Sequence, residues 1–164
     1  MMRWWAGRIR QFVRYVTGRV SRPEREALTS WVTLDQLTLF DSMHRADRRH
    51  GMDVVAALRR GGFQDHDLLL AGLLHDSGKG RDLHVWHRVC WSLSERHGLR
   101  LRRAFERVPT FRRAFDTIAT HAEKSAELAL AAGCTQRAAD LIRHQAAPID
   151  EELGLALQLA DEAS

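Results

Sequence analysis

The chain has 164 residues, which is enough for one domain with a substantial hydrophobic core. Its 45% hydrophobic and 28% charged residues are typical of an ordinary globular protein and exclude a long disordered chain. The formal net charge of +4 is scattered along the chain, so there is no strong signal for nucleic-acid binding.

Cysteine spacing and hydropathy indicate the compartment. The two cysteines, Cys90 and Cys134, lie far apart, which argues against a disulfide framework and against a zinc finger. No apolar stretch reaches the roughly 18 to 20 residues of a membrane span. Arginines interrupt the apolar N-terminus, unlike in a signal peptide. We therefore expect a cytoplasmic protein.

Residues 4–20 predict an amphipathic helix. Trp5, Ile9 and Phe12 share an apolar face with three valines, and arginines flank this face. One interpretation is that the helix packs on its own domain or on a second copy of the chain, as in a homodimer. Tryptophan, phenylalanine and arginine also suit a lipid headgroup region, so peripheral membrane contact through residues 1–20 is a second interpretation. A nucleic-acid-binding arm is a third.

The rest of the chain predicts further helices separated by short turns. Residues that favour the N-cap position precede four of them, at Ser21, Thr33, Asp65 and Thr135. The expected helices cover residues 22–30, 34–43, 45–60, 66–75, 83–97, 117–132, 136–145 and 148–161, and Pro109 breaks a basic segment over residues 99–115. Alternating β-branched runs are missing, so we expect an all-α fold.

The most informative stretch is the apolar run 68–74, followed by His75 and Asp76. The run is hydrophobic almost all round, which indicates a central helix of a bundle. A histidine and an aspartate buried at the end of such a helix are costly unless they have a partner. A divalent metal is the obvious partner, because neutral imidazole and carboxylate are both good metal ligands.

Six residues are candidate metal ligands: His50, His75, Asp76, His121, His144 and Asp161. They lie on or near the ends of five predicted helices, and a metal site in a bundle needs side chains that converge from facing helices. Each residue alone is more often a hydrogen-bonded histidine or a helix cap. The set of six, with a His-Asp doublet in its centre, is what indicates a site.

An upstream histidine, a His-Asp doublet and a distant aspartate resemble the motif of the HD-domain superfamily of metal-dependent phosphohydrolases. Here the motif falls on His50, on His75-Asp76 and on Asp161. The resemblance covers the chain from about Ala46 to the C-terminus.

His121 and His144 resemble the two added histidines of the binuclear branch of this superfamily. That branch includes cyclic-dinucleotide phosphodiesterases and bacterial diadenosine tetraphosphate hydrolases. The Gly-Tyr-Pro signature that follows the second histidine in some members is absent, and Gln145-Ala-Ala-Pro148 stands in its place. Cyclic-di-GMP is therefore not the expected substrate.

The resemblance implies an HD-domain helical bundle over residues 44–164, with residues 1–43 as an N-terminal helical extension packed on it. It also implies one or two divalent metal ions per chain, drawn from Fe, Mn, Co, Ni and Mg. In the two-metal case His50, His75 and Asp161 would hold the first ion and His121 and His144 the second, with Asp76 as the bridge.

Asp76 and Lys79 are the predicted catalytic residues. Lys79 would stabilise charge on the phosphate oxygens, although a lysine here would also interact favourably with the C-terminal dipole of the preceding helix. The implied function is hydrolysis of a phosphomonoester, phosphodiester or phosphoanhydride of a nucleotide or similar small molecule by metal-activated water. Two alternatives stay open: a non-catalytic HD protein that binds metal or nucleotide as a regulator or scaffold, and a di-iron HD oxygenase.

Overall fold

The computed structural model describes residues 18–80, 105 and 108–164. Within these residues the chain forms seven α-helices, one 3-10 turn and no strand, which confirms the predicted all-α class. The elements are α2 (Arg22–Leu28), α3 (Leu34–Ser42), α4 (Arg45–Arg60), α5 (His66–Leu74), η1 (Ser77–Lys79), α8 (Pro109–Ala131), α9 (Gln136–Arg143) and α10 (Leu153–Ala163). The predicted helix over residues 83–97 lies outside the described residues, and so does the predicted helix over residues 4–20 as far as residue 17. Residues 18–20 are described and are not helical.

The predicted N-cap residues do cap their helices. Ser21 and Thr33 form capping boxes with the residues three positions later. Asp65 and Thr135 each accept a hydrogen bond from the backbone N–H of the third residue after them. These four helix starts are therefore determined by local sequence.

Two predicted helix starts differ from the structure. Helix α8 begins at Pro109 and continues without a break for 23 residues, because a proline in the first turn lacks only an N–H that would be unpaired there. The last helix begins at Leu153 rather than at Pro148. Asp150 Oδ1 accepts hydrogen bonds from the N–H groups of Glu152 and Leu153 at 2.9 and 2.7 Å, which holds the preceding residues in a turn.

Helix α5 lies at the centre of the fold. Its residues from Leu68 to Leu74 are all buried, and it contacts α3, α4, α9 and α10. Contact with α4 is close: a Cβ atom added to Gly72 would lie 3.0 Å from a methyl group of Leu58 and 3.1 Å from one of Val54. Each fully buried leucine contributes about 1.5–3 kcal/mol to folding. The apolar packing of α5 therefore fixes the position of the residues at its C-terminal end.

Helices α2 and α3 share the same core. Leu28 and Phe40 are buried in one hydrophobic cluster with the leucines of α5. Arg49 of α4 adds a polar link to α2, because its guanidinium lies 2.7 Å from Glu24 Oε1. The same guanidinium lies 2.7 Å from Oδ1 of Asp53, one turn further along α4. Helices α2 and α3 thus pack against the other described helices.

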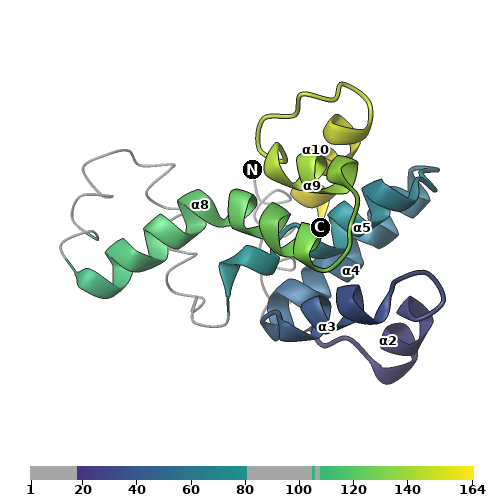
Figure 1. Cartoon of the computed structure of the whole chain (residues 1–164), viewed down its shortest axis with the longest axis horizontal. Helices are drawn as coiled ribbons and strands as arrows, with labels where there is room; N and C mark the ends of the chain where they lie inside the picture. Colours follow the sequence, from purple (N-terminus) through teal and green to yellow (C-terminus); the bar gives the residue numbers. More distant parts are fainter. Residues whose placement is uncertain (1–17, 81–104, 106–107) are drawn as a thin grey trace, which may run out of the picture.

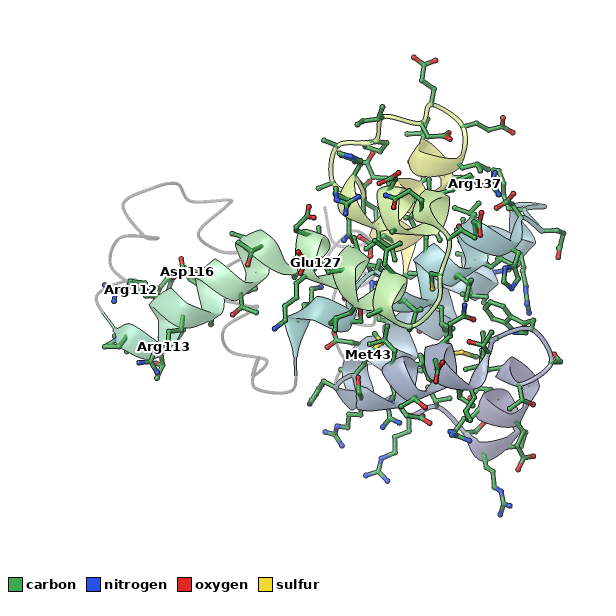
Figure 2. All side chains as sticks on the ribbon, viewed as in Figure 1. Met43, Arg112, Arg113, Asp116, Glu127 and Arg137 are labelled. Atoms are coloured by element: carbon green, nitrogen blue, oxygen red, sulfur yellow. The ribbon has the colours of Figure 1, made fainter. Side chains whose placement is uncertain are left out.

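Helix α8 is the longest of the described helices. Its C-terminal half lies against η1 and α9, while its N-terminal half projects away from the helical body (Figure 1). Exposed charged residues, among them Arg112, Arg113 and Asp116, cover the projecting half (Figure 2). No helix within the described residues combines the length and the hydrophobicity that crossing a membrane requires.

Substitution of two leucines of α10 tests how much the packing around α5 contributes to stability. Leu157 is 0% exposed, whereas Leu159 on the same helix is 57% exposed. We expect Leu157→Ala to lower the free energy of unfolding by about 2–5 kcal/mol, because it leaves a cavity beside α5. The matched Leu159→Ala should change it by less than about 0.5 kcal/mol. Denaturant unfolding measures both, and equal losses would contradict the observed packing.

Candidate metal centre

The end of α5 brings His75 and Asp76 into the middle of the molecule. His75 is the C-cap residue of α5, Asp76 precedes the turn η1, and each is 1% exposed. The backbone of Asp76 leaves helical geometry (φ −100°, ψ 5°), so the chain turns there while both side chains stay buried. Burying these polar groups costs free energy unless other groups pair with them, so the residues around them have to be identified.

Two further helices supply the first of these partners. His50 of α4 places its Nε2 atom 2.6 Å from Oδ1 of Asp161 on α10. The Nε2 atom of His75 lies 3.4 Å from the same oxygen, and the centroids of the two imidazole rings are 5.2 Å apart. Three residues that are widely separated in the sequence therefore lie close together.

Helix α8 and the turn η1 approach Asp76 with two more side chains. His121 Nε2 lies 3.5 Å from Asp76 Oδ1. Lys79 Nζ donates to Asp76 Oδ2 at 2.6 Å. The side chains of His121 and Lys79 are each 18% exposed, so they lie between the buried carboxylate and solvent.

The two carboxylate oxygens of Asp76 differ in their hydrogen bonding. Asp76 Oδ1 is buried and has no hydrogen-bond partner within the described residues. Such an oxygen is costly in a folded protein unless a cation or a donor reaches it. Ligand atoms of His50, His75 and Asp76 all lie within 4.8 Å of one another. Two imidazoles and a carboxylate at this spacing, with a second carboxylate from Asp161, fit a divalent metal ion.

The two imidazoles that face Asp76 are oriented by backbone carbonyls. His75 Nδ1 lies 3.0 Å from the carbonyl oxygen of Gly72, and His121 Nδ1 lies 2.5 Å from that of Ile118. In the neutral rings, the Nδ1 atoms donate to these carbonyls. The Nε2 lone pairs then point towards Asp76, as a metal ligand or a proton acceptor requires.

The pKa values of the two histidines beside Asp76 are shifted in opposite directions. Burial by itself lowers the pKa of His75, but Asp76 and Asp161 outweigh it and raise the pKa to about 9. Burial also lowers the pKa of His121, and there the Lys79 ammonium adds to the effect, so the pKa ends below its usual value. The net pKa of Asp76 lies well below the usual carboxyl value, because His75, Lys79 and further histidines outweigh its burial. The pKa of Asp161 is lowered as well, since hydrogen bonds from His50 and His75 outweigh its burial.

Two glycines let the backbones that carry the site approach one another. A Cβ atom added to Gly51, the residue after His50, would lie 2.5 Å from the carbonyl oxygen of Leu73. A Cβ atom at Gly78 would lie 2.5 Å from the carbonyl oxygen of His121 and 2.7 Å from the backbone nitrogen of Ser125. Ser125 Oγ also accepts a hydrogen bond from the Gly78 N–H at 2.8 Å. Glycine at these positions therefore sets the distances between α4, α5, η1 and α8.

His144 is the predicted ligand that the structure does not bring to this cluster. It is the C-cap residue of α9 and lines a separate pocket of about 610 Å³ together with Arg137 and Asp140. Its neighbour Gln145 is buried instead, and the Gln145 amide donates to the backbone carbonyl of His75 at 3.3 Å. The predicted ligands that do meet are His50, His75, Asp76, His121 and Asp161.

The cluster opens into a pocket of about 420 Å³, and sequence reasoning missed part of its lining. Gln158 and Glu162 of α10 line it beside Asp161, and Gln145 lines it from the end of α9. Helical spacing could have identified Gln158, because it lies three residues before Asp161 and so shares its face of the helix. Glu162 and Gln145 gave no comparable signal.

Neither a scan against protein-family models nor searches of curated proteins and of solved structures find a match to this chain. The arrangement of the residues themselves therefore carries the functional interpretation.

The raised pKa of His75 predicts how stability and metal binding depend on pH. Without metal, the protonated ring is favoured in the folded state, so its stabilising contribution is complete below pH 6.5 and is lost as pH rises towards 9. A metal needs the neutral ring and must displace that proton. We expect the apparent affinity for Mn²⁺ to rise about tenfold per pH unit between about pH 6.5 and 8.5, while the Tm of the metal-free protein falls.

Titration calorimetry in buffers of different ionisation enthalpy measures the protons released on metal binding. Release of about one proton per ion near pH 7 is the expected result. A pH-independent affinity without proton release would contradict the assignment of His75 as a ligand.

Gly78→Ala tests the close approach of η1 to α8. The added methyl group would strike backbone atoms of His121 and Ser125, so we expect a loss of about 1–3 kcal/mol in the free energy of unfolding. Gly61→Ala is the matched control, because Gly61 has a φ of −74° and its nearest neighbour to an added Cβ is 3.3 Å away. If denaturant unfolding showed Gly78→Ala to be as stable as Gly61→Ala, the backbone contact would not be as close as described.

Proposed function

We propose that this chain is a metal-dependent phosphohydrolase of the HD type that acts on a nucleotide or a similar small phosphoester. The observation that supports this function best is the buried Oδ1 atom of Asp76, which has no hydrogen-bond partner within the described residues. His75 and His121 face that oxygen with their Nε2 atoms at 3.4 and 3.5 Å. The resemblance to the HD motif suggests the class of reaction, and the geometry supports the roles that we propose for the residues.

His50, His75, Asp76 and Asp161 would hold one divalent metal ion. A bound ion of this kind lowers the pKa of a water ligand towards neutrality and withdraws charge from a phosphoryl oxygen. On the other side of Asp76, His121 is the one imidazole that the described residues of this pocket offer, since His144 lines a different pocket. One imidazole and a shared carboxylate are a poor ligand set for a second ion. We therefore propose one metal per chain.

His121 would act on the attacking water. Its lowered pKa keeps the imidazole neutral at pH 7, and its Nδ1 atom is engaged with the carbonyl of Ile118. The Nε2 atom is therefore the free acceptor, and it faces the centre of the site. A neutral imidazole in this position can hold a water molecule and accept its proton as the bond to phosphorus forms.

Lys79 would act on the phosphate. Its ammonium group lies 2.6 Å from Asp76 Oδ2 and lines the pocket. A phosphate bound there would share the ammonium with Asp76. Because the surroundings are largely buried, this positive charge would stabilise the oxygens of the transition state more strongly than it would in water.

Three variants test this assignment against metal content and turnover. Asp76→Asn should lose both the metal and phosphate release, because the unpaired oxygen loses its charge. His121→Ala should keep about one metal per chain and lose turnover, which separates a base from a ligand. His144→Ala is the control and should keep both properties.

Elemental analysis of untagged protein, together with phosphate release from a panel of phosphoesters, provides the measurements. Two metals per chain in the wild type, one of them lost in His121→Ala, would overturn the single-metal assignment. Full metal content in Asp76→Asn would overturn the site itself. Oxygen consumption without phosphate release would replace hydrolysis by oxygenase chemistry.

A further inference from the structure

The pocket above the metal centre has two chemically different sides. The residues of η1 and α8 contribute Lys79 and His121, which face Asp76. Helix α10 contributes Gln158 and Glu162, together with the ligand Asp161. The first side suits the reacting phosphate, so the second side is available to the rest of the substrate.

Charge is distributed unequally over this pocket. Among the described residues that line it, Lys79 is the one with a permanently cationic side chain. Three carboxylates line the same pocket, those of Asp76, Asp161 and Glu162. The charges of Asp76 and Asp161 are offset by histidines and by Lys79, and a bound ion would offset them further. Glu162 is exposed and receives a hydrogen bond only from a neutral amide within the described residues. A second or third phosphate group directed towards α10 would meet a negative charge.

Gln158 and Glu162 also form a defined pair. Gln158 Nε2 donates to Glu162 Oε1 at 3.2 Å, one helical turn along α10. The second carboxylate oxygen of Glu162 and the carbonyl oxygen of Gln158 remain as acceptors. Hydroxyl and amino groups are the substrate groups that such acceptors bind.

We propose that the substrate is a phosphomonoester with a single phosphate group, whose leaving group carries hydroxyl or amino donors that bind Gln158 and Glu162. A nucleoside monophosphate has this chemistry, and nucleoside triphosphates and dinucleoside polyphosphates do not. This inference rests on the proposed function, because it takes the reacting phosphate to lie between Lys79 and the metal ligands. Glu162 then determines specificity: it attracts a sugar hydroxyl and repels an additional phosphate.

The test compares adenosine monophosphate with adenosine triphosphate as matched probes. The full chain is loaded with Mn²⁺, and free Mn²⁺ is buffered at one concentration so that chelation by the triphosphate has no effect. We expect kcat/KM to favour the monophosphate at least tenfold. Glu162→Gln should reduce this preference at least threefold, and Glu162→Lys should abolish it. Glu127→Gln, at an exposed position of α8 outside this pocket, is the control and should leave it unchanged (Figure 2).

A second comparison tests the donor half of the inference. Replacing adenosine monophosphate by its 2′,3′-dideoxy analogue should lower kcat/KM about tenfold in the wild type, and at most about threefold in Glu162→Gln. A triphosphate that is turned over as well as the monophosphate, or a preference that Glu162→Lys does not change, would overturn the inference.

Failure of the proposed function would look different. If no phosphoester were hydrolysed, the proposed phosphohydrolase function would be wrong. Calorimetric titration of the same two nucleotides would still test the inferred preference for a single phosphate group. Tighter binding of the monophosphate than of the triphosphate, lost in Glu162→Lys, is then the supporting result. Tighter or equal binding of the triphosphate overturns it.

Discussion

A carboxylate buried at the end of an apolar helix is the constraint on which the rest of this structure depends. Asp76 is 1% exposed, and one of its oxygens has no hydrogen-bond partner within the described residues. Replacing such a group by a well-packed apolar residue is often neutral or stabilising. Its position beside two imidazoles, a lysine and a second carboxylate is therefore best explained by chemistry, since stability alone would not favour it.

The scaffold makes this arrangement rigid. The site residues come from α4, α5, α8 and α10, and each of these helices is held by the core around α5 or by a direct backbone contact. Gly51 and Gly78 allow separations that no larger residue would permit. A site carried on helices in backbone contact keeps its geometry before a ligand arrives, which is what preorganised electrostatic stabilisation needs.

Residues whose position depends on local rules were predictable from the sequence. The caps at Ser21 and Thr33 act within one turn of helix, so they required no knowledge of the fold. The proximity of His50, His75 and Asp161 is a long-range feature. The expectation of it came from a family resemblance and from the cost of polar groups at the ends of apolar helices.

The side of α9 that faces the centre was not predictable. Residues in a helix advance by about 100° each, but His144 already lies outside α9, with φ −101° and ψ 17°. At a helix end the backbone torsion of one residue decides which of two neighbours turns inward, and here it is Gln145. The helical periodicity of the sequence does not predict that torsion angle. The start of α10 depended in the same way on the hydrogen bonds of Asp150.

The two histidines beside Asp76 show how one carboxylate can serve two roles. His75 lies near a second carboxylate, Asp161, and its pKa rises to about 9. His121 has no second carboxylate among the causes of its shift and lies near Lys79, so its pKa falls. When neighbouring groups have their pKa values moved in opposite directions, their roles usually differ. The ring between two carboxylates holds a proton more tightly than a free imidazole does. The ring beside the ammonium stays neutral and free to take a proton. The asymmetry around Asp76 thus moves the pKa values of two neighbouring imidazoles to opposite sides of the ordinary histidine value.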